Sequence, residues 1–268
     1  GGVPRPPLLM GICNVTPDSF SDGGRYLDPA DAVSHGRRLF AEGADIVDVG
    51  GESTRPGADP VPEHTELARV LPVVEALAPF GRVSVDTTKE GVARAAVERG
   101  ATIINDVSAE LAPVAAELGV GFLAMHRQGD PKTMQDAPAY GDVVAEVAEA
   151  LDAAAERARD VGVTELWVDP GLGFGKTDVH NLALVANLHR LVSLGHPVAI
   201  GASRKRTWAE LLARSDGSAE LPGPDDRPEG SVASAGWATP QGVAVLRVHD
   251  VAPTAQAIRL VCDPPSGP

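Results

Sequence analysis

The sequence is poor in cysteine and lacks both long apolar runs and an excess of positive charge. Its 268 residues include two cysteines, Cys13 and Cys262, which fit a reducing compartment and give no zinc-binding spacing. No apolar run approaches the roughly 20 residues of a membrane-spanning helix, and the first ten residues, GGVPRPPLLM, lack a signal-peptide pattern. We therefore expect a cytoplasmic protein that does not bind a membrane.

The scarcity of positive charge excludes a second class of partner. The formal net charge is −14 at pH 7, which argues against binding to nucleic acid driven by the overall field. If the substrate is an anion, the cationic side chains that bind it must be gathered locally.

Eight short apolar runs end in polar residues or glycine. They are rich in β-branched residues, as is typical of strands buried on both faces. The runs cover residues 8–13, 46–49, 83–85, 103–104, 120–125, 166–168, 198–200 and 243–246.

Segments with helical spacing lie between these runs. Asp28 and Pro29 have the pattern of an N-cap followed by proline at the first helical position. Further helices are predicted over residues 89–98, 112–118, 141–161, 178–194 and 205–213. The alternation predicts a (β/α)8 barrel, a TIM barrel, formed by a single domain over residues 1–268, with a flexible loop over residues 214–230.

Polar side chains follow several of the predicted strands, at the end of the barrel where active sites of this architecture lie. They are Asn14, Asp86, Asn105, Asp169 and Arg247. Carboxylates and a carboxamide that converge suit a flat, nitrogen-rich heterocycle such as guanine or a pterin. The alternative is that each side chain caps a neighbouring loop, which is the better interpretation for one aspartate and a weaker one for three.

Basic residues follow the last two predicted strands. They lie in Ser203-Arg204-Lys205 and in Arg247-Val248-His249-Asp250, where barrels of this kind often bind phosphate. Strand alternation would send Arg247 and His249 to the same side. SRK alone would be read as a solvated helix start, but the two motifs together favour a phosphate or diphosphate site.

Three loops are rich in glycine. DPGLGFGKTDVHN, residues 169–181, links a strand to a helix, and its glycines either form a tight turn or let the backbone approach a ligand. NVTPDSFSDGG and GGESTRPGA, residues 14–24 and 50–58, are either ordinary surface loops or a mobile lid with a further anion contact.

Eight motifs, in their order and spacing, resemble dihydropteroate synthase. They are NVTPDSFSDGG, GGESTRPGA, SVDT, NDVS, MHRQGDPKTMQ, DPGLGFGK, SRK and RVHD. The resemblance covers residues 10–261 and implies a homodimeric barrel of folate biosynthesis. It also implies that the enzyme joins p-aminobenzoate to 6-hydroxymethyl-7,8-dihydropterin diphosphate, with release of diphosphate and assistance from Mg²⁺.

The resemblance also implies roles for individual residues. The pterin would be held by Asp86, Asn105, Asp169 and Lys205. Arg247 would stack on the pterin and reach the diphosphate with His249, and Met125 would contact substrate. Asp86, Lys205, Arg247 and His249 would be the catalytic group, with C–O cleavage preceding attack by the amine.

The remaining implied roles concern the metal, the closing loop and the second substrate. Asn14 would help to ligate Mg²⁺, and Thr54, Arg55 and Pro56 would belong to the loop that closes over the site. The aminobenzoate would meet Phe174, Pro56 and Lys205.

Two departures from the family pattern bear on the aminobenzoate pocket and the dimer. In the family a serine usually follows the SRK lysine and contributes to the aminobenzoate pocket. Here that position is Arg206. Gly236 and Pro240 interrupt the helix that commonly contributes to the dimer contact, and proline should end or kink that helix early.

Two other classes of function compete with the synthase. A pterin-binding barrel without this reaction would be a degenerate paralogue or the folate-binding module of a corrinoid methyltransferase. The methyltransferase needs no diphosphate site, and Arg55, Lys205, Arg247 and His249 argue against it. A scaffold barrel without a ligand leaves the polar strand ends unexplained.

Overall fold

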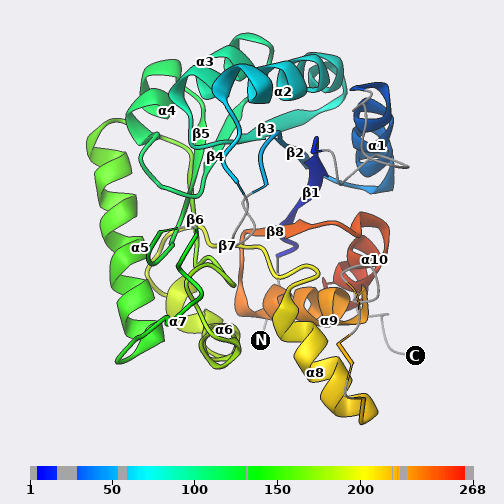
Figure 1. Ribbon diagram of the computed structural model, residues 1–268, viewed down its shortest axis with the longest axis vertical. Helices are drawn as coiled ribbons and strands as arrows, with labels where there is room; N and C mark the ends of the chain where they lie inside the picture. The colour runs from blue at the N-terminus through cyan, green and yellow to red at the C-terminus, as the bar shows by residue number, and fades with distance from the viewer. Residues whose placement is uncertain are drawn as a thin grey trace.

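The chain alternates strands with helices from one end to the other (Figure 1). The computed structural model describes residues 5–16, 29–53, 59–130, 132–218, 220, 221, 223 and 228–262. The strands are β1 (Leu8–Asn14), β2 (Ile46–Gly50), β3 (Arg82–Asp86), β4 (Ile103–Asp106), β5 (Gly121–Met125), β6 (Leu166–Asp169), β7 (Ala199–Ile200) and β8 (Val245–Val248). The α-helices are α1 (Pro29–Glu42), α2 (Glu63–Leu77), α3 (Glu90–Glu98), α4 (Ala112–Leu118), α5 (Val143–Asp160), α6 (Asp178–Ala186), α7 (Leu188–Val192), α8 (Arg206–Asp216), α9 (Pro228–Ala238) and α10 (Val251–Cys262). The 3-10 helices of the described ranges include η1 (Ala78–Phe80) and η3 (Thr239–Gln241).

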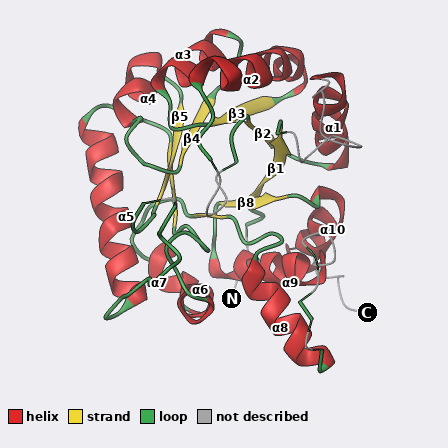
Figure 2. Cartoon of the chain, in the orientation of Figure 1, coloured by secondary structure: helices red, strands yellow, loops and turns green. Residues whose placement is uncertain are grey.

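The eight strands form one parallel sheet that closes into a barrel. Hydrogen-bonded neighbours follow the order β6-β5-β4-β3-β2-β1-β8-β7. The two ends of this order, β6 and β7, meet through a parallel bridge between Val168 and Val198. Figure 2 shows the strands enclosed by a ring of helices. The predicted (β/α)8 barrel is confirmed.

Strand alternation divides the core into an inner and an outer part. The inside of the barrel is filled by Met10, Ile46, Ile103, Leu123, Trp167, Ala199 and Val245. The larger outer cluster packs the strands against the helices and includes Val47 and Val85. Because side chains two positions apart on a strand point to the same side, Asp48, Asn105 and Asp169 lie one layer above the inner apolar residues.

Local chemistry explains why several predicted helix bounds were wrong. Residues 178–194, predicted as one helix, form two helices, α6 and α7, which meet at Asn187. The Nδ2 of Asn187 donates to the carbonyl of Ala183 at 2.8 Å. The helix predicted over 141–161 begins at Val143, because the Asp142 side chain accepts from the Val144 and Ala145 N–H groups as an N-cap. The predictions also omit α2 and α10.

The C-terminal third differs from the prediction in similar ways. β8 includes Arg247, which was expected to follow the strand. Of the residues 214–230 predicted as a flexible loop, 214–216 lie in α8 and 228–230 lie in α9. Residues 219, 222 and 224–227 lie outside the described part. As expected, α9 ends before Pro240, which lies in η3. Asp28 lies outside the described residues.

None of the helices in the described ranges combines the length and the hydropathy that crossing a membrane requires.

Candidate active site

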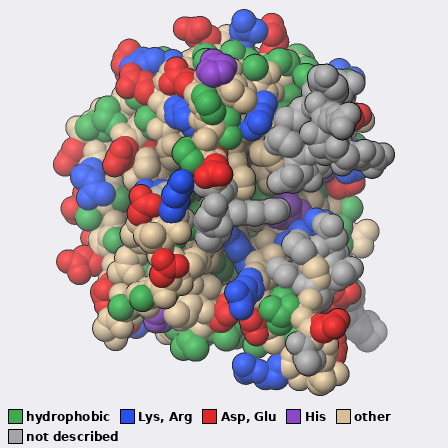
Figure 3. Space-filling model, viewed as in Figure 1, with side chains coloured by type: hydrophobic (Ala, Val, Ile, Leu, Met, Phe, Trp, Pro, Cys, Tyr) green, Lys and Arg blue, Asp and Glu red, His purple; other side chains and the backbone are tan. Residues whose placement is uncertain are grey.

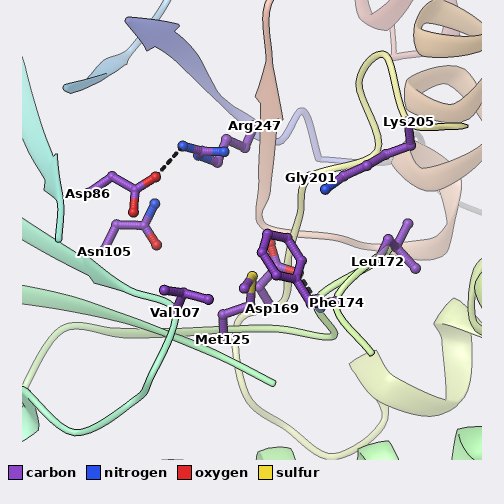
Figure 4. Close-up of a pocket in the computed structure, with 11 residues that line it drawn as sticks. Asp86, Asn105, Val107, Met125, Asp169, Leu172, Phe174, Gly201, Lys205 and Arg247 are labelled. Carbon is purple, nitrogen blue, oxygen red and sulfur yellow. Dashed lines mark hydrogen bonds and ion pairs between the residues drawn. The ribbon is translucent and has the colours of Figure 1, made fainter. Parts of the chain in front are cut away.

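A cavity opens at the carboxyl ends of the strands (Figure 4). Its lining residues are Asp86, Asn105, Val107, Met125, Asp169, Gly171, Leu172, Phe174, Gly201, Lys205 and Arg247. Seven of the predicted substrate residues are in this set: Asp86, Asn105, Met125, Asp169, Phe174, Lys205 and Arg247.

The strand register brings these side chains together. Asp86 is the last residue of β3 and is in register with Asn105 on β4, while Met125 on β5 is in register with Asp169 on β6. The previous inward residues below Asn105, Met125 and Asp169 are Ile103, Leu123 and Trp167 of the apolar barrel core, and the one below Asp86 is the buried Ser84. Neighbouring parallel strands therefore present a carboxylate, a carboxamide, a thioether and a second carboxylate to one space.

Arg247 crosses this space from β8 and binds two carboxylates. Its Nη2 donates to Asp86 Oδ2 at 2.7 Å, and its Nε donates to Asp48 Oδ2 at 2.7 Å. Asp48 Oδ2 also accepts from Asn105 Nδ2 at 3.0 Å. Arg247 was expected to stack on the ligand and reach a diphosphate; in the structure its guanidinium is bound to Asp86.

Asp48 is a site residue that the sequence analysis missed. It lies inside β2, is fully buried, and has one oxygen, Oδ1, without a hydrogen-bond partner. The sequence does contain a sign of this position. Asp48 lies inside the apolar run 46–49, two residues before Gly50, and strand alternation sends both positions to the same side of the sheet.

Burial changes the protonation of this cluster. It raises the pKa of Asp86 to about 7; Arg247 opposes the rise, and the nearby Asp48 carboxylate adds to it. Burial lowers the pKa of the Arg247 guanidinium, but the carboxylates of Asp48 and Asp86 raise it, and the net pKa lies above its ordinary value. Near neutral pH the site thus holds a permanent cation beside a carboxyl group that can gain or lose its proton.

The loop from Asp169 to α6 forms another wall. Burial raises the pKa of Asp169, although its Oδ1 accepts from the N–H of Gly171 at 2.7 Å. The Phe174 ring faces the Lys205 ammonium, with Nζ 4.5 Å from the ring centroid. In Figure 4, Asp86, Asn105 and Arg247 lie on one side of the cavity and Leu172 and Lys205 on the other, so the two ends differ in character.

The two predicted phosphate loops lie in contact with one another. The backbone N–H of His249 donates to Ser203 Oγ at 3.2 Å, and the ring Nδ1 of His249 lies 3.1 Å from the same oxygen. Arg204 Nη2 pairs with Asp250 Oδ1 at 2.7 Å. His249 follows the last residue of β8 and is not among the described residues that line the cavity. Burial, with Arg204 and Arg247, lowers the pKa of its imidazole to about 3, so the ring is neutral at pH 7.

Asn14 ends β1 close to Asp86. It is in register with Gly50, which is in register with Asp86. A Cβ on Gly50 would lie 3.5 Å from both Asn14 Oδ1 and Asp86 Cβ. Within the described ranges, no group of three or more His, Cys, Asp or Glu residues could hold a metal. A single amide oxygen still fits Mg²⁺, which commonly takes one or two protein ligands and completes its shell with water and substrate phosphate.

The remaining predicted contacts concern the second substrate. Thr54, Arg55 and Pro56 lie outside the described residues. Arg206 is the first residue of α8, and its guanidinium pairs with Glu210 at 3.1 Å with a largely exposed side chain. Figure 3 shows acidic and basic side chains interspersed over the face of the molecule seen in this view.

The comparison with known families decides the assignment. The family model described as pterin binding enzyme matches residues 10–249. The dihydropteroate synthase of Mycobacterium leprae is 48% identical over 265 residues, covering 96% of this chain and 93% of the relative.

The chain belongs to the dihydropteroate synthase family.

Solved structures of other dihydropteroate synthases have the same fold. The Xanthomonas albilineans dihydropteroate synthase with 4-aminobenzoic acid has a TM-score of 0.86 and 48% identity, covering 96% of this chain and 92% of that chain. The enzyme from the same organism in complex with 7,8-dihydropteroate has a TM-score of 0.83 and 45% identity, with the same coverage.

Proposed function

We propose that the chain condenses 6-hydroxymethyl-7,8-dihydropterin diphosphate with p-aminobenzoate to give 7,8-dihydropteroate and diphosphate. The observation that carries this assignment is the convergence of Asp86, Asn105, Asp169, Lys205 and Arg247 on one cavity. Relatives whose solved complexes contain 4-aminobenzoic acid and 7,8-dihydropteroate support the same substrate and product here.

The pterin binds at the Asp86 end of the cavity. Its amino-amidine edge offers two parallel N–H donors, which suit a carboxylate acceptor such as Asp86 or Asp169. Asn105 is held by its bond to Asp48, so its amide oxygen remains available to the ligand. An incoming pterin competes with Arg247 for Asp86, and its binding frees the guanidinium for the diphosphate.

The reaction transfers the pterin methylene from oxygen to nitrogen. The C–O bond breaks, with its electron pair leaving on diphosphate, and the positive charge on the pterin methylene is stabilised by Asp86 and Asp169. The aminobenzoate nitrogen then gives its electron pair to the methylene carbon and loses a proton. An aromatic amine is already a nucleophile, in keeping with a cavity whose described lining contains no serine, cysteine or histidine.

The metal proposal concerns Asn14. We propose that its amide oxygen holds Mg²⁺ together with diphosphate oxygens at the carboxyl end of β1. When bound, the ion would neutralise charge on the leaving diphosphate. Arg247 supplies the protein's own positive charge beside that position.

We also propose that the chain works as a cytoplasmic homodimer. The scarcity of cysteine, with two residues far apart in the sequence, supports a reducing compartment. The dimer is proposed from the family resemblance, and Trp237, half-exposed on the helix that the resemblance assigns to the contact, is the residue chosen to test it. Light scattering after gel filtration should give a dimer for the wild type and a monomer for Trp237→Glu; a wild-type monomer would contradict the proposal.

Diphosphate release tests the function. With both substrates and Mg²⁺ the protein should release diphosphate, and without p-aminobenzoate the steady release should fall to the blank. Asp86→Asn should be strongly impaired, whereas Asp160→Asn, an exposed aspartate at the end of α5, should match the wild type. No release at any Mg²⁺ concentration would favour a barrel that binds pterins without this reaction.

A further inference from the structure

A buried lysine lies behind the cavity wall formed by the loop between β6 and α6. The side chain of Lys176 is 3% exposed. Its Nζ lies 2.8 Å from His126 Nδ1, 3.0 Å from the carbonyl oxygen of Gly171 and 3.1 Å from that of Phe174. Lys176 is not one of the predicted site residues, and it is not among the residues that line the cavity.

The three close partners match the three N–H donors of an ammonium group. Two are carbonyl oxygens, and the third is an imidazole nitrogen, which accepts when the ring is neutral and carries its proton on Nε2. Burial, followed by the charge of Lys176, lowers the pKa of His126 to about 3, so this ring is neutral at pH 7. Burial also lowers the pKa of Lys176 to about 7, with Asp169 favouring its charge and Lys205 opposing it.

These contacts join two segments of backbone that already touch. Gly171 and Gly175 both have φ of +64°, and a Cβ on them would lie 1.9 Å from the His126 carbonyl oxygen and 2.2 Å from that of Gln128. The loop thus lies directly against the segment that follows β5. Lys176 spans this contact, since its Nζ donates to carbonyls of the loop on one side and lies against His126 Nδ1 on the other.

The loop carries cavity residues, and so does the strand end. Lys176 binds the carbonyl of Phe174 itself and that of Gly171, which directly precedes Leu172. On the other side, Met125 directly precedes His126, and all three of Leu172, Phe174 and Met125 line the cavity. Two of the groups proposed to face the pterin, Asp86 and Asn105, are instead bound to Arg247 and Asp48. The third, Asp169, accepts from the N–H of Gly171 in the loop. The Asp86 end of the cavity thus has a support of its own, separate from Lys176.

We propose that Lys176 is a positioning residue that sets Leu172 and Phe174 relative to Met125 and thereby shapes the aminobenzoate end of the site. The proposal rests on the proposed function, because the aminobenzoate end is defined by that reaction. Lys176 acts through the loop and touches no substrate.

The test separates the two substrates. Lys176→Met keeps the length of the side chain and removes its donors, so we expect the KM for p-aminobenzoate to rise about tenfold or more, because small misplacements of binding groups have effects of this size. The KM for the pterin diphosphate should change by less than about threefold. Lys132→Met, at an exposed lysine in the segment after β5, is the matched control and should behave as the wild type.

A second variant keeps the test decisive if Lys176→Met does not fold. His126→Ala removes one acceptor while the lysine remains, and it should raise the same KM by a smaller factor. An unchanged KM for p-aminobenzoate in the folded variant, or an equal rise for both substrates, would overturn the proposal. Wild type assayed in parallel distinguishes the cases: an inactive wild type counts against the proposed function, whereas an active wild type with unselective variants counts against Lys176 alone.

Discussion

Arg247 Nη2 donates to Asp86 Oδ2 at 2.7 Å, so the cation that we propose for the leaving diphosphate is paired with the carboxylate that we propose for the pterin. The two groups partly neutralise one another in the cavity. In the proposed reaction, a pterin that takes over Asp86 would release Arg247 as its diphosphate arrives. Pterin binding would thereby be linked to the positive charge available beside the leaving group.

Removing the Asp86 carboxylate should weaken pterin binding. Hydrogen bonds to a charged group contribute about 1.5–3 kcal/mol, so Asp86→Ala should raise the Kd for a pterin ligand by roughly 10-fold to 150-fold. Titration calorimetry measures this, with Asp160→Asn as the control. An affinity equal to that of the wild type would remove Asp86 from the site.

Pterin binding should depend on pH near neutrality. Because the pKa of Asp86 is raised to about 7, the carboxyl group is protonated below that pH and cannot accept two N–H bonds. The Kd should therefore fall as the pH rises from about 6 to 8 and level off above the pKa. Asp86→Asn should lack this step, and an identical pH profile in the two proteins would contradict the assignment.

Asp48 should control the position of that pH step. Its carboxylate raises the pKa of Asp86, and it binds both Arg247 and Asn105. Asp48→Asn keeps the shape of the side chain and removes the like charge, so the midpoint of pterin binding should move to lower pH. A midpoint that stays in place or moves to higher pH would show that Asp48 does not act on Asp86 through its charge.

Close packing of the β6–α6 loop should make Gly171 intolerant of a side chain. An alanine Cβ would lie 1.9 Å from the His126 carbonyl oxygen, so the backbones must separate. Gly119→Ala is the control, because Gly119 has a similar φ of +67° with nothing within 4 Å of the added Cβ. The control should lose about 1–2 kcal/mol for left-handed strain, and Gly171→Ala about 1–3 kcal/mol more. Denaturant unfolding measures both, and equal losses would show that the loop yields without cost.

The polar strand ends were predictable because two regularities agree. Apolar runs located the strands, and the barrel rule placed Asp86, Asn105 and Asp169 at the mouth. Arg247 was assigned to a loop, but the period of two still gave it the inward phase of Val245. His249 follows Val248, where the strand has ended and alternation no longer fixes direction, so its ring binds Ser203 away from the described cavity lining.

Contacts between distant segments could not be read in this way. Asp48 is hidden inside an apolar run, and its two partners come from β4 and β8. The glycines of DPGLGFGK indicated close approach of the backbone to something. The sequence could not show that the approached atoms are the carbonyls of His126 and Gln128, or that Lys176 fastens the contact.

The central claim is that this cavity joins the two substrates. A single-turnover experiment with the protein in excess over the pterin diphosphate, in the presence of p-aminobenzoate and Mg²⁺, should form one 7,8-dihydropteroate for each diphosphate released. Tight binding of the pterin diphosphate with no dihydropteroate formed would contradict the account.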